Sequence, residues 1–412
     1  MLQKWDFAVI GGGASGIAAA ISAAKVGDRV VLLEKSSALG RKISASGNGR
    51  CNLMNNGKPV YYGEPSFVLE AFKHLSPNDL KLFWHTAGII LKEEDEGRIY
   101  PCTFHSSTVL EALKTNLHLL DVDIRLQTSV ISINKRNNLF FLVTDSGLFT
   151  ADRILIATGG TASPRLGGVD SGYHFLRSFG HRILPVFPAL CPLVSDNLSI
   201  SGLSGIRVRC ALSLFDKKKN MLFKTKGEVL FTDYGISGIC SMQCARFIND
   251  ESYYIELDLI SHLFPEENLI LDELTFRRNR FSDLPPEYLL NGILVPKLSF
   301  AVLKQAQITL RGRKTGDLTD NELRLIALHL HCYSLQIKGT RGFENAQVTA
   351  GGACCSEFDP SNMESYIVKG LHASGEVLNI DGDCGGYNLM FAFISGILAG
   401  SNGRINRKGE TI

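Results

Sequence analysis

The sequence predicts an α/β protein built on a parallel β-sheet, and three observations indicate this class. Residues 5–34 contain an apolar strand, a glycine-rich turn, an alanine-rich helix and a second apolar strand, in that order. Residues 153–160 and 348–400 again combine short apolar strands with glycine turns. Residues 193–340 have a different texture, with alternating polar and apolar residues followed by charged, helix-like stretches. A Rossmann-type sheet interrupted by an inserted domain accounts for all three.

The first βαβ unit contains the G-x-G-x-x-G pattern of a dinucleotide-binding turn. Its glycines allow a tight turn, a close approach of the backbone to a pyrophosphate, and close packing of helix on strand. The free N–H groups at the start of the helix attract phosphate. Glu34 ends the second strand, where a carboxylate can accept hydrogen bonds from ribose hydroxyls. The unit therefore predicts NAD or FAD, and the residues predicted to contact it are Gly11, Gly13, Ala14, Ser15, Gly16 and Glu34.

The cofactor motifs come from both ends of the chain, which favours FAD over NAD because FAD binds in an extended form. The loop 36–52 combines backbone donors, cations and amides that suit a diphosphate, although a surface loop with incidental charge would look similar. The helix that begins near residue 387 can aim N–H groups at the flavin N1/C2 carbonyl edge; a helix start packed by glycines is the alternative. The further residues predicted to contact FAD are Lys35, Arg41, Lys42, Ser46, Gly47, Asn48, Gly49, Val130, Thr158, Gly159, Gly160, Gly375, Glu376, Asp381, Gly386, Tyr387, Asn388 and Leu389.

Composition limits the class of partner. The chain has 412 residues and a net charge of +2, so no strong field calls for nucleic acid or an anionic membrane. None of the ten cysteines forms a C-x-x-C pair, and we expect no metal. No apolar run is long enough to span a membrane, and no signal peptide is evident, so we expect a cytoplasmic protein.

Several longer motifs extend this interpretation over nearly the whole chain. They include GGGASG near the N-terminus, GRKISASGNGRCN at 40–52, ATGG at 157–160, FTDYGISG at 231–238 and GLHASGEVLNIDGDCGGYNLMFAFISGILAG at 370–400. Together they resemble the YhiN/BaiN-like family of bacterial flavoproteins, which includes aminoacetone oxidases. The resemblance implies a glutathione-reductase-like FAD domain, an inserted β-barrel and helical domain, and non-covalent FAD. Asp233 stands where the family often has His, so substrate specificity does not carry over from a characterised member.

These observations predict three segments and one function. Residues 1–192 and 341–412 form the two parts of the FAD-binding domain, and 193–340 form the inserted domain, β-rich over about 193–262 and helical over about 263–340. The predicted function is hydride or electron transfer between a small organic substrate and FAD, with the inserted domain deciding the substrate. A transiently bound NAD(P)H or a protein is a candidate electron donor. The alternative is a non-catalytic flavoprotein or one associated with RNA modification.

Two residues are candidates for catalysis. Arg50 has a close polar setting for an anionic group, and Tyr387 could stack near the flavin or simply pack. No Ser/His/acid arrangement stands out in the sequence, and no histidine is assigned a role.

Overall fold

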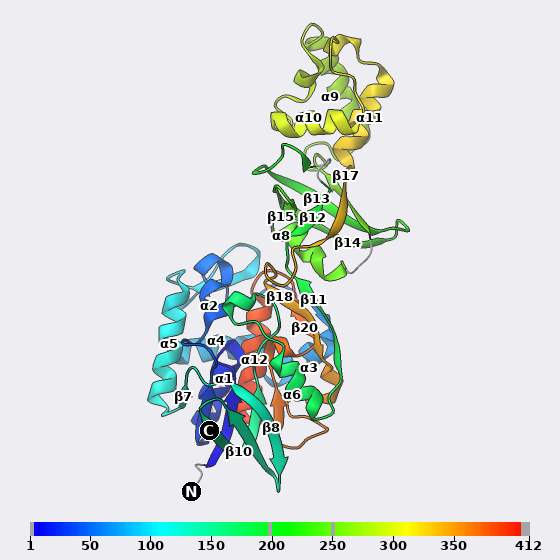
Figure 1. The fold of residues 1–412 in the computed structure, drawn as a ribbon. Coiled ribbons are helices and arrows are strands. Elements are labelled where there is room, and N and C mark those ends of the chain that lie inside the picture. Colours follow the sequence, from blue (N-terminus) through cyan, green and yellow to red (C-terminus); the bar gives the residue numbers. More distant parts are fainter. Residues whose placement is uncertain (1–3, 197–199, 249–251, 405–412) are drawn as a thin grey trace. The chain divides into compact units, whose positions relative to one another are not determined.

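The computed structural model describes residues 4–196, 200–248 and 252–404 (Figure 1). The chain divides into two compact units. The first unit contains Met1–Pro188 and Gln347–Ile412, and the second contains Ala189–Ala346. The sequence placed the corresponding domain boundaries after residues 192 and 340.

The first unit is built on a seven-stranded sheet. The long strand β10 belongs to both its parallel and its antiparallel part. Its C-terminal half lies between two parallel neighbours, β1 and β19, and the parallel order continues from β1 to β2 and β7. Its N-terminal half pairs with β9 in an antiparallel meander that ends in β8. The strands are β1 (Lys4–Ile10), β2 (Val30–Leu33), β7 (Asp123–Arg125), β8 (Val130–Arg136), β9 (Leu139–Thr144), β10 (Gly147–Ile156) and β19 (Leu371–Ala373).

The two ends of the chain meet in the middle of the first unit. Helix α1 (Ala14–Lys25), blue in Figure 1, packs along helix α12 (Tyr387–Ser401), which is red. A Cβ on Gly396 would lie 2.2 Å from the carbonyl oxygen of Ser15, so glycine is what lets the helices come this close. Helix α12 is apolar on almost every side, as expected for a helix enclosed by other elements.

Smaller elements surround this centre. Helix α4, for example, begins with a capping box in which Ser76 and Asp79 satisfy each other's backbone N–H groups. These elements are α2 (Arg41–Ala45), α3 (Pro65–His74), α4 (Pro77–Thr86), α5 (Ser106–Leu119), α6 (Ser171–Ser178), β3 (Met54–Asn55), β4 (Tyr61–Gly63), β5 (Leu91–Glu93), β6 (Arg98–Pro101) and β20 (Ile380–Gly382).

The chain leaves the first unit and returns to it through two neighbouring strands, β11 (Ile183–Ala189) and β18 (Val348–Ala353). The carbonyl of Arg182 accepts a hydrogen bond from the N–H of Cys354, and Gly351 lies against Pro185. The two strands are therefore antiparallel. The intervening chain is an insertion whose two ends lie side by side.

The second unit contains a closed six-stranded barrel in the order β12-β15-β14-β13-β16-β17, followed in space by a helical part. The predicted fold, an α/β Rossmann-type domain with an inserted barrel-like and helical domain, is confirmed. The strands are β12 (Leu193–Ser195), β13 (Arg207–Asp216), β14 (Met221–Phe231), β15 (Gly235–Ser237), β16 (Tyr253–Asp258) and β17 (Tyr333–Thr340). The helices are α8 (Ile239–Met242), α9 (Glu267–Arg280), α10 (Pro296–Gln305) and α11 (Asp320–His331).

One part of the predicted segment boundaries needs correction. The sequence placed residues 333–340 in the helical part, but they form β17, which closes the barrel between β12 and β16. Tyr333, Leu335 and Ile337 are buried while Gln336 and Lys338 are exposed. This two-residue alternation is the pattern of a barrel strand. The sequence analysis assigned it to the helical part because a helix immediately precedes it.

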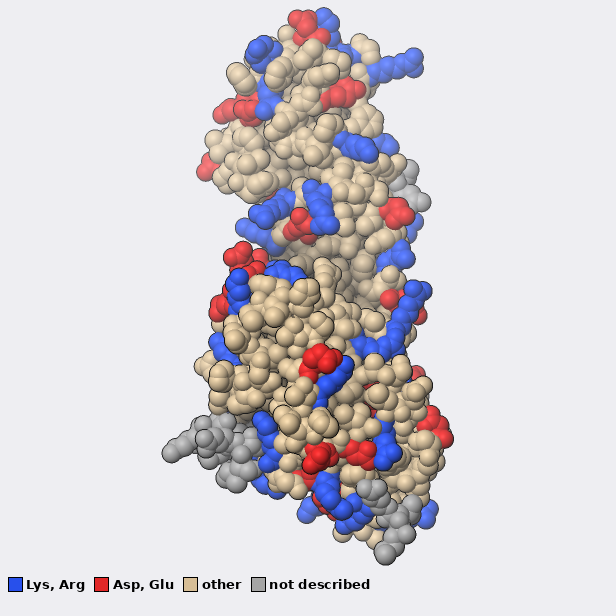
Figure 2. Space-filling model, turned by 90° about the vertical axis from the view of Figure 1, so that its left-hand side faces the viewer, with Lys and Arg blue, Asp and Glu red and all other residues tan. Residues whose placement is uncertain are grey.

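Positive and negative side chains are mixed on the surface. Figure 2 shows Lys and Arg interspersed with Asp and Glu on the face in view. Among the described residues, no helix combines the length and apolar character that crossing a membrane requires.

Candidate functional site

The glycine turn after β1 has the geometry that nucleotide binding needs. A Cβ on Gly16 would lie 1.9 Å from the carbonyl oxygen of Gly11. Helix α1 can therefore approach the turn this closely only because residue 16 is glycine. Gly13 is the N-cap of α1 and no side chain caps the helix. The first bond of the helix is Ile17 N to Gly13 O, which leaves the N–H groups of the first turn available to an anion. Space is open beyond Gly13, since nothing lies within 4 Å of a Cβ placed there.

Glu34 joins this turn to the loop after β2. Its two carboxylate oxygens accept the N–H groups of Gly12 and Ser36, each at 2.7 Å. Two accepted bonds leave further lone pairs on a carboxylate, so a ribose hydroxyl can still donate to it. The loop before β8 also reaches this point, because the N–H of Thr128 donates to the carbonyl of Glu34 at 2.9 Å, and Val130 begins β8 just beyond it.

The predicted cationic residues of the 36–52 loop have different partners. Lys42 Nζ lies 3.2 Å from each carboxylate oxygen of Glu376. Arg41 donates to the carbonyl of Arg165 at 2.5 Å. Lys35 lies just before this loop, and the protein around its amine lowers the pKa of that amine by partial desolvation. The pair Lys42–Glu376 therefore ties the loop to the C-terminal part of the chain.

Glu376 in turn organises the turn after β10. Its Oε1 accepts the N–H of Thr349 at 3.1 Å, and Thr349 Oγ1 accepts the N–H of Ala162 at 2.9 Å. A Cβ on Gly160 would lie 2.4 Å from Thr349 Oγ1, whereas space is open beyond Gly159. The turn after β10 thus meets the start of β18 at the carboxyl end of β10, which is the usual ligand side of a parallel sheet.

The start of α12 forms a second helix N-terminus at the site. Gly386 is the N-cap with φ of 103°, and no side chain caps the helix. Asn388 turns its amide back onto both backbone groups of Gly382, at 2.8 Å each. The segment is fixed from outside by Asn55, which donates to Gly385 O at 2.8 Å, and by Tyr61, which donates to Tyr387 O at 2.9 Å.

These residues fit an FAD. Two uncapped helix N-termini, an acid at the end of β2, and glycines facing open space are the features that the cofactor's pyrophosphate, ribose and flavin require. Buried polar atoms without a partner also mark the site: Asn52 Oδ1, Thr161 Oγ1 and Ser374 Oγ. Buried polar groups are nearly always hydrogen-bonded, and a bound cofactor or water would supply partners for these atoms.

Ser374 and Asn52 are residues that the sequence analysis did not select. The Ser374 carbonyl accepts from Ser15 Oγ at 3.4 Å, at the start of α1. Asn52 Oδ1 lies 2.7 Å from the position of a Cβ on Gly386. Neither proximity has a local sequence signal, because each joins segments more than 300 residues apart.

The two catalytic candidates have structural partners. The Arg50 guanidinium lies 4.5 Å from the ring centroids of Tyr100 and Phe104 and forms an ion pair with Glu94 at 3.2 Å. The hydroxyl of Tyr387 donates to Lys58 O at 3.1 Å, and Tyr387 is buried. These contacts account for both side chains, and a catalytic role for either stays a prediction.

The remaining predicted residues lie along the same edges. Ser46 Oγ donates to the carbonyl of Ile43, Gly47 and Asn48 have positive φ, and Gly49 faces open space. Thr158 follows β10, and a Cβ on Gly375 would meet Ser15 Oγ at 2.7 Å. Ala14, Leu389 and Gly11 lie at the starts of α1 and α12 and in the first turn, and Asp381 is buried in β20.

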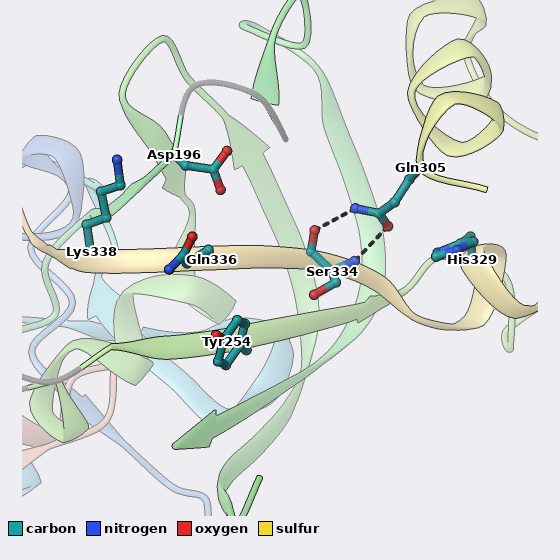
Figure 3. Close-up of a pocket in the computed structure, with 7 residues that line it drawn as sticks. All are labelled: Asp196, Tyr254, Gln305, His329, Ser334, Gln336 and Lys338. Carbon is teal, nitrogen blue, oxygen red and sulfur yellow. Dashed lines mark hydrogen bonds between the residues drawn. The ribbon is translucent and has the colours of Figure 1, made fainter. Parts of the chain in front are cut away.

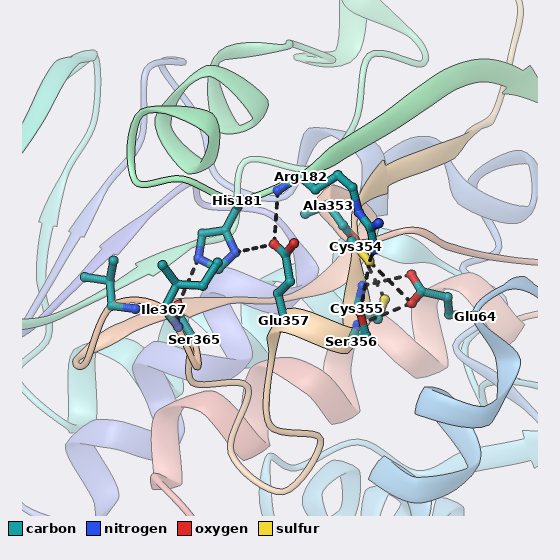
Figure 4. Close-up of polar contacts among 11 residues, drawn as sticks. Glu64, His181, Arg182, Ala353, Cys354, Cys355, Ser356, Glu357, Ser365 and Ile367 are labelled. Atoms are coloured by element: carbon teal, nitrogen blue, oxygen red, sulfur yellow. Dashed lines mark hydrogen bonds and ion pairs between the residues drawn. The ribbon is translucent and has the colours of Figure 1, made fainter.

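A second polar network lies around β11 and β18 (Figure 4). Ser365 Oγ is 2.9 Å from His181 Nε2, and His181 Nδ1 is 2.9 Å from a carboxylate oxygen of Glu357. The sequence indicated no such Ser/His/acid arrangement. The His181 side chain is fully enclosed, however, and Ser365 Oγ already accepts two backbone N–H groups, those of Ile367 and Val368. The network therefore joins these segments by hydrogen bonds, and Ser365 is not an exposed nucleophile.

The second unit contains a separate pocket of about 430 Å³ (Figure 3). Gln305 uses both ends of its amide on the backbone of Ser334, with bonds of 2.8 and 2.9 Å. The other polar groups that line the pocket come mainly from exposed side chains of β16 and β17. The residues that line the pocket are Asp196, Tyr254, Gln305, His329, Ser334, Gln336 and Lys338.

Known proteins resemble the chain over nearly its full length. A family model described as HI0933-like protein Rossmann domain matches residues 5–402. A 3-dehydro-bile acid delta(4,6)-reductase of Clostridium scindens is 35% identical over 402 residues, which are 95% of this chain and 97% of that protein. A ribosomal RNA dihydrouridine synthase of Escherichia coli is 29% identical over 406 residues, 96% of each chain.

Solved structures are similar to the chain at lower identity, and one of them illustrates this. A 3-ketosteroid delta1-dehydrogenase from Sterolibacterium denitrificans, in complex with 1,4-androstadiene-3,17-dione, has a TM-score of 0.49 and 13% identity. The match covers 97% of this chain and 99% of that one.

Proposed function

Because this chain belongs to the HI0933-like Rossmann family and is an FAD-dependent oxidoreductase, we propose that it reduces a carbon–carbon double bond conjugated to a carbonyl in a small organic substrate. The resemblance to the YhiN/BaiN-like family is confirmed by the same matches. The cofactor is FAD.

The observation that carries the proposal is the reaction shared by two full-length relatives. A delta(4,6)-reductase of a 3-dehydro-bile acid saturates double bonds conjugated to a 3-oxo group, and dihydrouridine is uridine with its C5=C6 bond saturated. Each of these bonds is conjugated to a carbonyl, which makes the carbon at its far end an acceptor for hydride. A protein similar to both over almost its whole length is best assigned to the chemistry that they have in common.

The residues of this chain hold and orient the cofactor. FAD, when bound and reduced, supplies the hydride. The first turn of α1 would hold the pyrophosphate, Glu34 would hold a ribose, and the first turn of α12 would hold the pyrimidine edge of the flavin. The N–H groups of α12 favour negative charge at that edge, which stabilises reduced flavin.

The other parts of the function follow from the same premise. We infer that reducing equivalents come from a transiently bound NAD(P)H or a protein, and that the insertion selects the substrate. We also infer a cytoplasmic location, since all ten cysteines are free thiols, as a reducing compartment requires. Arg50 and Tyr387 remain the candidates for a catalytic role.

A second candidate substrate is a uridine in RNA. The full-length similarity to a ribosomal RNA dihydrouridine synthase favours it. The balanced charge of the chain, 43 Lys and Arg against 41 Asp and Glu, favours a small molecule, because RNA binding depends strongly on positive charge.

The test is anaerobic reoxidation of photoreduced holoprotein, followed at the flavin absorbance. Conjugated enones, including 3-oxo-Δ4 and Δ4,6 steroids, should reoxidise the flavin and gain two hydrogens, and their saturated counterparts should not. Ribosomal RNA lacking dihydrouridine is assayed in parallel by mass spectrometry. If amines reduce the oxidised protein while no enone or RNA reoxidises the reduced one, the assignment as a reductase is wrong.

A further inference from the structure

The start of α12 presents hydrogen-bond donors beside one buried acceptor. The first bond of this 15-residue helix is Met390 N to Gly386 O at 3.0 Å. The preceding N–H groups of the first turn therefore point out of the helix without an intrahelical acceptor. Asn388 does not cap them, since its amide is bound to Gly382.

Asn52 supplies the acceptor. The residue is 9% exposed, and its Oδ1 is buried without a hydrogen-bond partner. The same atom lies 2.7 Å from the position that a Cβ on Gly386 would take, so it is at the N-cap of α12. Leaving a buried acceptor unsatisfied is destabilising, so a donor is expected to meet it when the site is filled.

The backbone before Asn52 is held in an unusual form that places this side chain. Gly47, Asn48, Gly49 and Cys51 all have positive φ, between 55° and 84°. Cys51 is fully buried, and a positive φ strains the backbone of a non-glycine residue. Such strain persists where the surrounding structure requires it, which agrees with a loop shaped to direct Asn52 towards α12.

A row of N–H donors next to a carbonyl acceptor matches one edge of a flavin. The pyrimidine ring of the flavin carries the C2 carbonyl, an acceptor, beside N3–H, a donor. We propose that Asn52 Oδ1 accepts a hydrogen bond from flavin N3–H while the first turn of α12 binds the C2 carbonyl. Asn52 is then a positioning residue that fixes the ring in its plane. The inference rests on the proposed placement of the pyrimidine edge at α12, and it does not depend on which substrate is reduced.

The first experiment compares FAD with N3-methyl-FAD in binding to the apoprotein. The wild type should bind FAD at least about 10-fold more tightly, because the methyl group removes the donor and meets Asn52. Asn52→Ala should reduce this preference to less than about 3-fold. Asn56→Ala should keep the wild-type preference, because Asn56 is exposed and its amide donates to Glu93 instead. If Asn52→Ala keeps the full preference, Oδ1 meets a water and the proposal is wrong.

The second experiment uses a variant that retains the acceptor, in case Asn52→Ala does not fold. Asn52→Asp still accepts N3–H and should still discriminate against N3-methyl-FAD. Its negative charge beside the pyrimidine edge should lower the midpoint potential of the bound flavin relative to wild type, whereas Asn56→Asp should leave the potential unchanged. An unchanged potential in Asn52→Asp would contradict the assignment. Since both readouts concern binding and potential, they stand even if no enone is reduced.

Discussion

At the scale of single residues, Glu34 combines a predicted role in cofactor binding with an observed role in the fold. The sequence indicated a ribose ligand, and the structure adds a structural task, because the carboxylate also bridges Gly12 and Ser36. Hydrogen bonds to a charged acceptor contribute more than neutral ones. A substitution here therefore acts on the fold of the turn as well as on the cofactor.

Glu34→Ala should weaken FAD binding by about 1–3 kcal/mol and also lower the free energy of unfolding of the apoprotein. Titration of FAD into apoprotein and urea denaturation measure the two effects. Glu70→Ala is the control, since Glu70 forms an ion pair with Lys73 on the surface, away from the glycine turn in sequence. Unchanged affinity for FAD in Glu34→Ala would rule out the ribose contact.

Cys51 is the residue of the 40–52 motif that most invites a redox role, yet burial raises the pKa of its thiol to about 11. Only a small fraction is thiolate at pH 8, and the thiolate is the nucleophile. Iodoacetamide should therefore modify the exposed Cys102 well before Cys51, as followed by peptide mass spectrometry. Rapid labelling of Cys51 in the folded protein would contradict this.

At the scale of elements, the start of α12 is the most constrained feature of the site. Gly386 has φ of 103°, and a Cβ there would lie 2.6 Å from Met54 O as well as close to Asn52. Neighbouring strands hold the turn through Asn55 and Tyr61. The element can receive a ligand because its own backbone donors are left free while the rest of the turn is fixed.

Gly386→Val should destabilise the protein by about 2–5 kcal/mol, from backbone strain together with overpacking, and should abolish FAD retention. Gly88→Val is the matched control, because Gly88 also has positive φ of 87° but faces open space. That variant should lose some stability and remain yellow. Full cofactor content in Gly386→Val would show that the α12 start does not contact the flavin.

At the scale of the whole molecule, the insertion is attached through two antiparallel neighbours, β11 and β18. The first unit contains every residue assigned above to the cofactor. Its sheet and its central helix pair, α1 with α12, are complete without residues 189–346. Cofactor binding and substrate selection should therefore be separable.

Replacing residues 189–346 by a short Asn-Gly turn should give a protein that folds and binds FAD without covalent attachment but no longer reduces enones. The expected readout is a yellow protein that releases unmodified FAD on heat denaturation. Full-length protein carrying substitutions in the Lys217–219 hairpin tip is the control, and it should keep both the flavin spectrum and activity. A folded but colourless deletion variant would contradict the division of tasks.

Acid should destabilise the whole fold through buried histidine. Burial lowers the pKa of His372 to about 3, against an ordinary value of 6.5. Between these values the unfolded chain binds more protons than the folded one, so the free energy of unfolding falls as pH falls. The His372 contribution to this loss should be about 2 kcal/mol between pH 7 and pH 5. His372→Asn retains a donor for the carbonyl of Asn362, and its urea midpoint should fall less over this range.

The sequence by itself determined the cofactor class, the fold class and the residues of the first turn, because the strand, glycines, helix and Glu34 lie within 30 consecutive residues. A requirement on the backbone within such a short segment produces a sequence motif that can be recognised. The α12 start could also be predicted, since a glycine pair precedes an apolar helix. By contrast, β17 was misassigned because its partners β12 and β16 are set by barrel closure and not by its neighbours in sequence.

Only the tertiary structure decided which side chains meet. It placed Asn52 at Gly386, Lys42 on Glu376 and His181 between Ser365 and Glu357. These partners are 176 to 334 residues apart in the chain. Contacts at such separations depend on how sheets and helices pack, and packing imposes no fixed spacing on the sequence.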